Sequence, residues 1–357
     1  MEVISIYDEI FEKIFLDIKE KYLSKDNFPK IIVGTGLSVA MGVPGMWKLS
    51  KKLDEEFKKI TDNNLREKWE IYNRKIEKEG LEAALLDISS SEEEFVEKIK
   101  HITSEYILEE EYNIDSKIME EKSGFEILLN YLIETVSVND KIIDIMTPNY
   151  DRIIERICDK LNITTTLGFI GNLYQKFDLD VLKNPNCRYQ KKIPIVRLFK
   201  PHGSINWIRE NNTEYQINDY NILKSKKEKI DIITPGSMKY KNSMINEIFN
   251  YHREIFNSLI TNRQKNYSLI IYGYGFNDQH FNVSFKDTAK NVLVLTRTIN
   301  VEFLNKALNH KNWTIFYKYE SNEKEIPKDE SYLIYDKKKY QIDVDLWNID
   351  NFSNKFI

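Results

Sequence analysis

Residues 31–38, Ile-Ile-Val-Gly-Thr-Gly-Leu-Ser, are the stretch that decides the fold, and the Gly-Val-Pro-Gly of 42–45 closes it. Three apolar residues before Gly34 are typical of a buried strand in a parallel sheet. Gly34 and Gly36 allow the backbone to approach a ligand closely, and Ser38 adds a hydroxyl donor. The pattern predicts a strand that runs into a dinucleotide's phosphate-binding turn at the start of a helix. An ordinary strand-to-helix turn gives the same short pattern, so other segments have to decide between the two.

The composition is that of a globular protein in a reducing compartment. The chain has 357 residues, 41% of them hydrophobic, enough for one large domain or a domain with an insertion. Its net charge of -4 gives no electrostatic pull toward nucleic acid, so no direct nucleic-acid binding is expected. The two cysteines, Cys158 and Cys187, are too few for a four-thiolate zinc site, so no zinc is expected. Without a signal-peptide pattern or the roughly 20 apolar residues of a membrane span, the protein is expected in the cytoplasm, with no membrane partner.

Alternating apolar segments predict an α/β fold, a Rossmann-like parallel sheet with helices on both faces. Helical spacing of apolar residues predicts amphipathic helices over 5–24 and 244–260. A charged stretch from 48 to about 138 has the same spacing, and we interpret it as a helical insertion. Strand-like runs occupy 31–33, 142–146, 195–199, 230–233, 269–272 and 292–295. The polar stretch 210–214 is expected to be a surface loop.

Polar residues and glycines follow several of the predicted strands. Because ligands bind beyond the carboxyl ends of parallel strands, these residues are expected to meet in one crevice. Asn149, Tyr150 and Asp151 follow the run 142–146, and His202 and Gly203 follow the run 195–199. The run 269–272 is followed by Gly273, Tyr274, Asn277 and Asp278. The residues at each strand end also have a purely structural explanation. Asn149 or Asp151 can cap the next helix, and Gly273 can form a tight turn.

Three motifs, in their order and spacing, resemble the sirtuin superfamily, and specifically its bacterial sirtuin-like branch. They are the glycine turn with Gly-Val-Pro at 42–44, Thr-Pro-Asn-Tyr-Asp at 147–151, and His-Gly-Ser at 202–204. The resemblance implies an NAD-binding catalytic domain over 28–300 that contains the helical insertion. The N-terminal helix of 1–27 would precede it. An extension of 301–357 would follow, with strands that pack on the core or make an oligomer contact.

The resemblance also implies roles for individual residues, with NAD+ as the substrate. The glycine turn would hold the pyrophosphate, and Asn149 and Asp151 would address the nicotinamide ribose and carboxamide. His202 would be a general base near the ribose hydroxyls. The residues implied to bind NAD+ are Gly34, Thr35, Gly36, Ser38, Pro44, Trp47, Tyr150, Gly203, Gly273, Tyr274, Asn277 and Asp278.

Two departures separate the chain from the protein deacylases of this superfamily. Those enzymes carry a zinc module held by four cysteines, which two cysteines cannot build. Their Gly-Ile-Pro precedes an acidic residue, an aromatic and an arginine, whereas Gly45, Met46 and Trp47 follow Pro44 here. Trp47 therefore only approximates the aromatic lid. Family members with this Asn-Tyr-Asp and His-Gly-Ser pattern are NAD-consuming effectors of bacterial antiphage defence, which implies an NAD+ glycohydrolase (NADase) that depletes NAD.

The residue types suit cleavage of the bond between nicotinamide and ribose. Breaking this bond generates positive charge on the ribose, so a catalyst must orient the ring, stabilise an oxocarbenium-like state and admit a nucleophile. Asn149 and Asp151 suit the first two tasks. His202, with an unperturbed pKa of about 6.5, can accept a proton from a ribose hydroxyl or an attacking water. Water would then give ADP-ribose and nicotinamide.

Two other classes of function fit the same residues. A noncatalytic sensor or scaffold would bind NAD or ADP-ribose without turnover. A protein deacylase or ADP-ribosyltransferase would release nicotinamide only when an acceptor is present. Because an uncontrolled NADase is toxic, we also expect control by a homo-oligomer, by a partner such as a HerA-like ATPase or a phage-sensing protein, or by the helical insertion.

Overall fold

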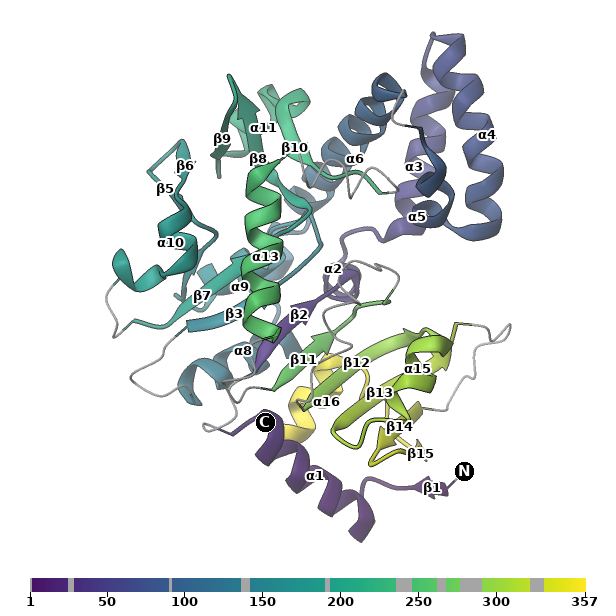
Figure 1. Cartoon of the computed structure of the whole chain (residues 1–357), viewed down its shortest axis with the longest axis vertical. Helices are drawn as coiled ribbons and strands as arrows, with labels where there is room; N and C mark the ends of the chain where they lie inside the picture. Colours follow the sequence, from purple (N-terminus) through teal and green to yellow (C-terminus); the bar gives the residue numbers. More distant parts are fainter. Residues whose placement is uncertain are drawn as a thin grey trace.

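The computed structural model of the chain describes residues 2–24, 29–89, 92–135, 142–189, 193–235, 246–261, 268–276, 291–321 and 331–357. Within them the chain forms a ten-stranded sheet, a second sheet of five strands and a separate group of helices (Figure 1). No helix in these ranges is long and apolar enough to cross a bilayer.

The ten-stranded sheet is mostly parallel. Its strands are β1 (Glu2–Ile4), β2 (Lys30–Val33), β3 (Ile142–Met146), β4 (Thr164–Thr166), β7 (Ile195–Phe199), β11 (Leu269–Tyr272), β12 (Val292–Ile299), β13 (Trp313–Glu320), β14 (Ser331–Tyr335) and β15 (Lys338–Ile342). They lie in the order β1-β15-β14-β13-β12-β11-β2-β3-β7-β4, and all neighbours from β13 to β4 run parallel. The predicted α/β fold is confirmed. The strands after residue 300 extend this same sheet, with β14 antiparallel to both neighbours.

Apolar side chains point to both faces of the sheet and are buried on both, as expected for a parallel sheet between helices. Along β2, Ile31 and Val33 join the core on one face and Ile32 joins the core on the other. The first face is covered by α1 (Glu9–Tyr22), α2 (Thr35–Met41), α8 (Gly124–Thr135), α9 (Ile153–Lys160) and α16 (Ile349–Phe356). The second face is covered by α13 (Glu247–Thr261) and α15 (Val301–Ala307) (Figure 1).

A group of helices between α2 and β3 has a core of its own (Figure 1). It consists of α3 (Met46–Lys59), α4 (Asn63–Glu79), α5 (Leu81–Ala84), the 3-10 turn η1 (Leu85–Asp87) and α6 (Glu93–Asn113). In its centre Phe57 stacks on Trp69 with ring centroids 4.6 Å apart, and Phe95 lies 5.3 Å from Phe57. Of the range 48–138 that we interpret as an insertion, α7 (Asp115–Glu120) and α8 instead pack on the sheet core through residues such as Ile118 and Leu128.

The second sheet is antiparallel, and the sequence did not predict it. Its order is β10-β8-β9-β6-β5. The strands are β5 (Phe169–Ile170), β6 (Gln175–Phe177), β8 (Gly203–Glu210), β9 (Thr213–Gln216) and β10 (Ile230–Ile232), and the short helices near them are α10 (Leu179–Lys183), η2 (Pro185–Cys187), α11 (Tyr220–Ser225) and η3 (Lys227–Lys229). The predicted strand at 230–233 forms, but in this sheet rather than in the parallel one. The predicted loop at 210–214 is the tight β8–β9 hairpin, in which Asn211 and Asn212 take φ of 50° and 58°.

Candidate functional site

A cavity of about 330 Å³ lies at the carboxyl ends of the central strands, where the sequence predicts a ligand crevice. Its volume is within the usual range of small-molecule sites, roughly 300–1,000 Å³. Segments that follow β2, β3, β7 and β11 all reach it. The predicted site residues that line it are Thr35, Gly36, Ser38, Pro44, Asn149, Tyr150, Asp151, His202, Gly273 and Tyr274.

Three buried polar side chains form one hydrogen-bonded group in the wall of the cavity. The Ser38 hydroxyl donates to Asp151 Oδ2 at 2.6 Å, and Asn149 Nδ2 donates to Ser38 Oγ at 2.8 Å. Nδ2 also donates to the carbonyl oxygen of Gly34 at 2.9 Å. Both amide hydrogens of Asn149 are thereby committed, so the group it can offer a ligand is Oδ1, an acceptor.

Asp151 contacts the start of helix α9 and also lines the cavity. Its Oδ1 accepts from the backbone N–H of Ile153 at 3.2 Å, at the start of α9, while Oδ2 faces Ser38. Burial raises the pKa of the Asp151 carboxyl, and the positive charge of Lys200 and the bond from Ser38 counteract part of that rise. The carboxyl thus bonds the first residue of α9 and lines the cavity, while the N-cap position of this helix is Arg152.

A buried ion pair fixes the segment after Asp151. The Arg152 guanidinium lies 2.6 Å from Glu111 Oε1 through one terminal nitrogen and donates to the same oxygen from Nε at 2.7 Å. The backbone N–H of Arg152 also donates to Glu111, and both side chains are buried. Since breaking a buried pair typically costs about 3–5 kcal/mol, Glu111 on α6 holds the β3–α9 segment firmly against the helical group.

His202 lies in the turn between β7 of the large sheet and β8 of the second sheet. It is 7% exposed and lines the cavity. The backbone around it is held on both sides, because the N–H of Ile233 donates to the His202 carbonyl at 2.9 Å and the N–H of Gly203 donates to the Lys200 carbonyl at 3.1 Å. The Tyr150 hydroxyl donates to the carbonyl of Ile233 at 2.5 Å, so the residue after β10 contacts both Tyr150 and His202.

The glycine turn makes a close contact between two backbone segments. The N–H of Gly34 donates to the Tyr272 carbonyl at 2.8 Å, and the N–H of Gly36 donates to the Gly273 carbonyl at 2.9 Å. A Cβ at Gly34 would stand 2.5 Å from the Gly273 oxygen, and a Cβ at Gly36 would stand 2.5 Å from the Gly273 Cα. The glycines are therefore required for the β2 and β11 ends to meet, a reason that the sequence alone did not reveal.

Several predicted site residues lie away from the cavity wall. Gly203 has a φ of +81° and packs on the second sheet, where a Cβ would stand 2.5 Å from the carbonyl oxygen of Asp231. Trp47 is 67% exposed, with the Lys51 ammonium 3.7 Å from its ring centroid. Gly34 does not line the cavity, and its carbonyl oxygen accepts a hydrogen bond from Asn149 Nδ2. Asn277 and Asp278 lie outside the described residues.

The sequence missed two sets of lining residues. The helical group contributes Leu49 from α3, Glu82 from α5 and Ile107 from α6. The end of β12 contributes Thr296, Arg297 and Thr298. Among the described residues that line the cavity, Arg297 is the one Lys or Arg. The sequence does contain a pattern that indicates Arg297, because Thr-Arg-Thr directly follows the apolar run 292–295, where ligand-binding residues are expected.

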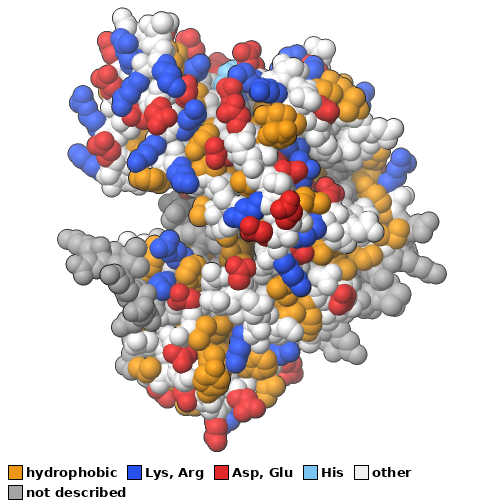
Figure 2. Space-filling view, turned by 180° about the vertical axis from the view of Figure 1, so that it is seen from behind, with side chains coloured by type: hydrophobic (Ala, Val, Ile, Leu, Met, Phe, Trp, Pro, Cys, Tyr) orange, Lys and Arg blue, Asp and Glu red, His pale blue; other side chains and the backbone are white. Residues whose placement is uncertain are grey.

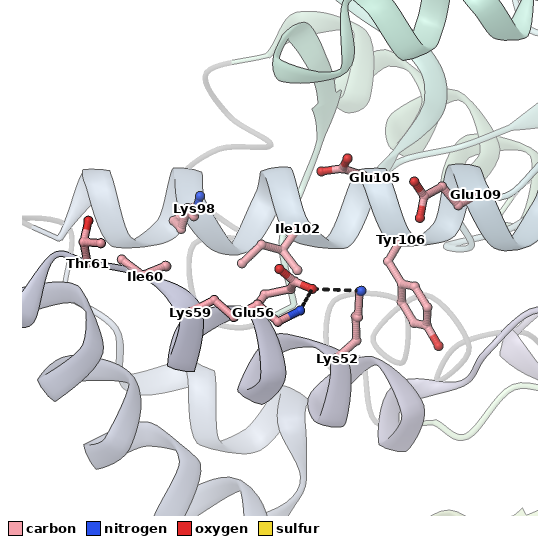
Figure 3. Close-up of a pocket in the computed structure, with 10 residues that line it drawn as sticks. All are labelled: Lys52, Glu56, Lys59, Ile60, Thr61, Lys98, Ile102, Glu105, Tyr106 and Glu109. Carbon is pink, nitrogen blue, oxygen red and sulfur yellow. Dashed lines mark hydrogen bonds and ion pairs between the residues drawn. The ribbon is translucent and has the colours of Figure 1, made fainter.

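A larger hollow of about 530 Å³ lies between α3 and α6, apart from the strand ends (Figure 3). Three of its charges pair with one another, since the Glu56 carboxylate lies 2.9 Å from both the Lys52 and the Lys59 ammonium groups. These hydrogen bonds lower the pKa of Glu56. Glu105, another charged lining residue, pairs with Lys227. Because this hollow contains neither a strand end nor the buried polar group, we place the candidate site in the smaller cavity.

Charge and metal-ligand patterns add little to the site. On one face of the molecule, Lys and Arg side chains are interspersed with Asp and Glu, including over the helical group (Figure 2). Within the described ranges, no three His, Cys, Asp or Glu side chains come together as metal ligands. Cys158 is buried and Cys187 is exposed, and both are free thiols.

Comparison with known families agrees with this location. Residues 144–299 match the family model described as a SIR2-like domain. This stretch is similar to a SIR2-like domain, which agrees with the predicted resemblance to the sirtuin superfamily over these residues and does not extend to its bacterial defence branch. The domain runs from β3 to β12, so it includes Asn149, Asp151 and His202 but not the glycine turn. SIR2-like domains typically bind NAD+. No curated protein matches the chain.

Proposed function

We propose that the chain is an NAD+ glycohydrolase, which uses water to cleave NAD+ into nicotinamide and ADP-ribose. The observation that carries the proposal is the meeting of Asn149, Asp151 and His202 at one cavity of a SIR2-like domain. These residues come from two segments about 50 positions apart, and each is less than one tenth exposed. A site that excludes water strengthens the electrostatic effect of every charge within it.

The lining residues fit the charge pattern of NAD+. The substrate has a cationic nicotinamide ring at one end and an anionic pyrophosphate in the middle. Asp151 offers a carboxylate to the first, and Arg297 offers a guanidinium to the second. The apolar side chains of Leu49 and Ile107 offer contact surface to a base. We assign Asn149 Oδ1, the acceptor of this side chain, to a ribose hydroxyl or the carboxamide.

The proposed reaction follows from these roles. The bond between ribose C1′ and the nicotinamide nitrogen breaks, and its electron pair stays with the nitrogen, so neutral nicotinamide leaves. The Asp151 carboxylate stabilises the positive charge that develops on the ribose. Water attacks C1′ and gives up its proton to His202, which later releases it to solvent. The balance is NAD+ plus water to nicotinamide, ADP-ribose and one proton.

The test is NAD+ consumption by the purified full chain, with products separated by chromatography. His202→Ala should lower kcat by roughly 10²–10⁴, the usual contribution of a general base, and Asn149→Ala should also abolish most turnover. His101→Ala is the control, because His101 lies on α6 outside the cavity lining. Binding of NAD+ without turnover would instead support a sensor. Nicotinamide release only with an added acceptor would support a deacylase or transferase.

We extend the proposal to antiphage defence, in which NAD+ depletion stops an infected cell. This step is supported by the resemblance of the motifs at 147–151 and 202–204 to bacterial sirtuin-like effectors. Since Leu49, Glu82 and Ile107 line the cavity, a partner or a second copy that moves the helical group would act directly on the site. The measurement is cellular NAD+ after phage challenge of bacteria that express the wild type or His202→Ala. Equal NAD+ levels in the two strains would contradict the defence role.

A further inference from the structure

Lys200 has a side chain that is fully buried directly behind the candidate site. It follows the last residue of β7 and precedes His202 by two positions, and its exposed fraction is 0%. Its backbone N–H donates to Nδ1 of His252 at 3.2 Å. Burial lowers the pKa of His252 to about 3, so this imidazole is neutral and its Nδ1 is available as an acceptor.

The Lys200 ammonium contacts three acceptors from three different segments. It lies 2.9 Å from Glu155 Oε1 on α9, and it donates to Ser204 Oγ on β8 at 3.0 Å. It also donates to the backbone carbonyl of Asp151. Two of these contacts are hydrogen bonds, and the contact with Glu155 is an ion pair.

These acceptors belong to both halves of the candidate site. The Asp151 carbonyl belongs to the residue whose carboxylate faces Ser38, and Glu155 lies one helical turn further along α9. Ser204 Oγ is 3.2 Å from the Tyr150 carbonyl, which also accepts from the N–H of Ile205 at 3.0 Å. A single charged group thus connects the segment of Asn149 and Asp151 to the turn that carries His202.

We propose that Lys200 is a positioning residue, whose ammonium holds the Asn149–Asp151 segment and the His202 turn at the separation that the reaction requires. The inference rests on the proposed NAD+ cleavage and deepens it. It also explains why a buried cation is present where an apolar side chain would fill the space without a desolvation penalty. Burial raises the pKa values of Asp151 and Glu155, and the charge of Lys200 acts against both rises, which is consistent with this placement.

The experiment uses a double variant, Lys200→Met with Glu155→Gln, in the full chain. Removing both charges avoids leaving Glu155 as an unpaired buried carboxylate, so the variant is expected to fold. The matched control variant is Lys160→Met together with Glu126→Gln, because Glu126 is also buried. Lys160 is on the same helix α9, pairs with Glu126 at 2.8 Å, donates to the Glu121 carbonyl at 2.8 Å and does not line the cavity.

We expect the double variant to lose roughly 10–100-fold in kcat for NAD+ cleavage, since misplacement by about 1 Å can cost that much. Its KM should stay within about threefold, because the residues that contact the substrate remain. The control variant should keep its kcat. A folded double variant with a wild-type kcat, or an equal loss of kcat in the control variant, would overturn the proposal.

Hydrogen–deuterium exchange over residues 147–156 measures the same positioning and does not depend on NAD+ turnover. The amides of this segment should exchange faster in the double variant than in the wild type or in the control variant. Unchanged exchange would overturn the role of Lys200 even if the wild type cleaves NAD+. If the wild type cleaves no NAD+ while exchange still rises, the proposed function fails and the positioning role stands.

Discussion

Substitution of Gly36 by Ala tests whether the glycine turn is shaped by a backbone contact as well as by a ligand. Gly36 is the second residue of α2, where helix propensity alone favours Ala over Gly by about 1 kcal/mol. The new Cβ, however, would stand 2.5 Å from the Gly273 Cα and 3.1–3.2 Å from its carbonyl atoms. Overpacking of this kind costs about 1–3 kcal/mol.

The upper end of that range applies here, because the obstructing atoms are backbone in the middle of the sheet. The N–H of Gly273 donates to the Leu295 carbonyl at 2.8 Å, and β11 is paired on both sides by β2 and β12, so the strand end cannot retreat. After subtraction of the propensity gain, the net loss is about 2 kcal/mol. With 357 residues and an unfolding entropy of about 2.1 cal/mol/K per residue, that corresponds to a fall in Tm of about 3 °C.

The assay is thermal unfolding of Gly36→Ala without any nucleotide, next to Gly45→Ala as a matched control. Gly45 also lines the cavity, but its Cβ would meet only the Val39 Cγ2 at 3.1 Å, and Val39 is a half-exposed side chain that can rotate. We expect the control to change Tm by less than about 1 °C. An unchanged or raised Tm for Gly36→Ala, combined with lost NAD+ binding, would refute the backbone explanation and leave the ligand as the only reason for the glycine.

Three further outcomes are expected. Arg297→Gln should raise the KM for NAD+ by about tenfold or more with little change in kcat, because a charged hydrogen bond to phosphate contributes about 1.5–3 kcal/mol to binding. Glu214→Gln tests a pH dependence: burial, with Asp231 nearby, raises the pKa of Glu214 from 4.5 to about 7, so its contribution to stability is complete below pH 4.5 and is lost as the pH rises to 7. Differential scanning fluorimetry should therefore show a higher Tm for the variant than for the wild type at pH 8, and no difference at pH 4. Trp47→Ala should leave Tm and NAD+ kinetics nearly unchanged, since the ring is 67% exposed; a tenfold loss of affinity would instead indicate that Trp47 closes over the ligand.

The parallel sheet could be predicted because its strands are buried on both faces. Strands in that environment read as continuous apolar runs, and those at 31–33, 142–146, 195–199, 269–272 and 292–295 all form strands of the large sheet. The position of the cavity followed from the same pattern, because parallel strands place their carboxyl ends on one edge.

The second sheet could not be predicted in the same way. Its strands β5 and β6 have two and three residues and are partly exposed, so they show no apolar run. The strand β8 contains the apolar Ile205, Trp207 and Ile208, but it begins immediately after His202, where the sequence indicated only ligand-facing residues beyond the end of a strand. Local pattern gives no information on which distant strand a short segment will pair with.

The contacts inside the site depend on pairings over long distances in the sequence. Ser38 and Asp151 are 113 positions apart, and Arg152 and Glu111 are 41 positions apart. Ser38 was expected to donate to a phosphate, whereas its hydroxyl is bonded to Asn149 and Asp151. Residue types at strand ends can indicate where a site lies, but which groups remain free for a ligand depends on these partners.

The helical group is part of the site rather than an appendage to it. It supplies Leu49, Glu82 and Ile107 to the cavity wall, while its own apolar core holds α3 to α6 together as a unit. Glu111, near the end of α6, binds the residue that follows Asp151 through both backbone and guanidinium. A displacement of this group would therefore change the shape of the cavity and the position of Asp151 at the same time. We expect control of the proposed activity to act through α6, because this helix runs from the core of the helical group to Glu111 and its ion pair with Arg152.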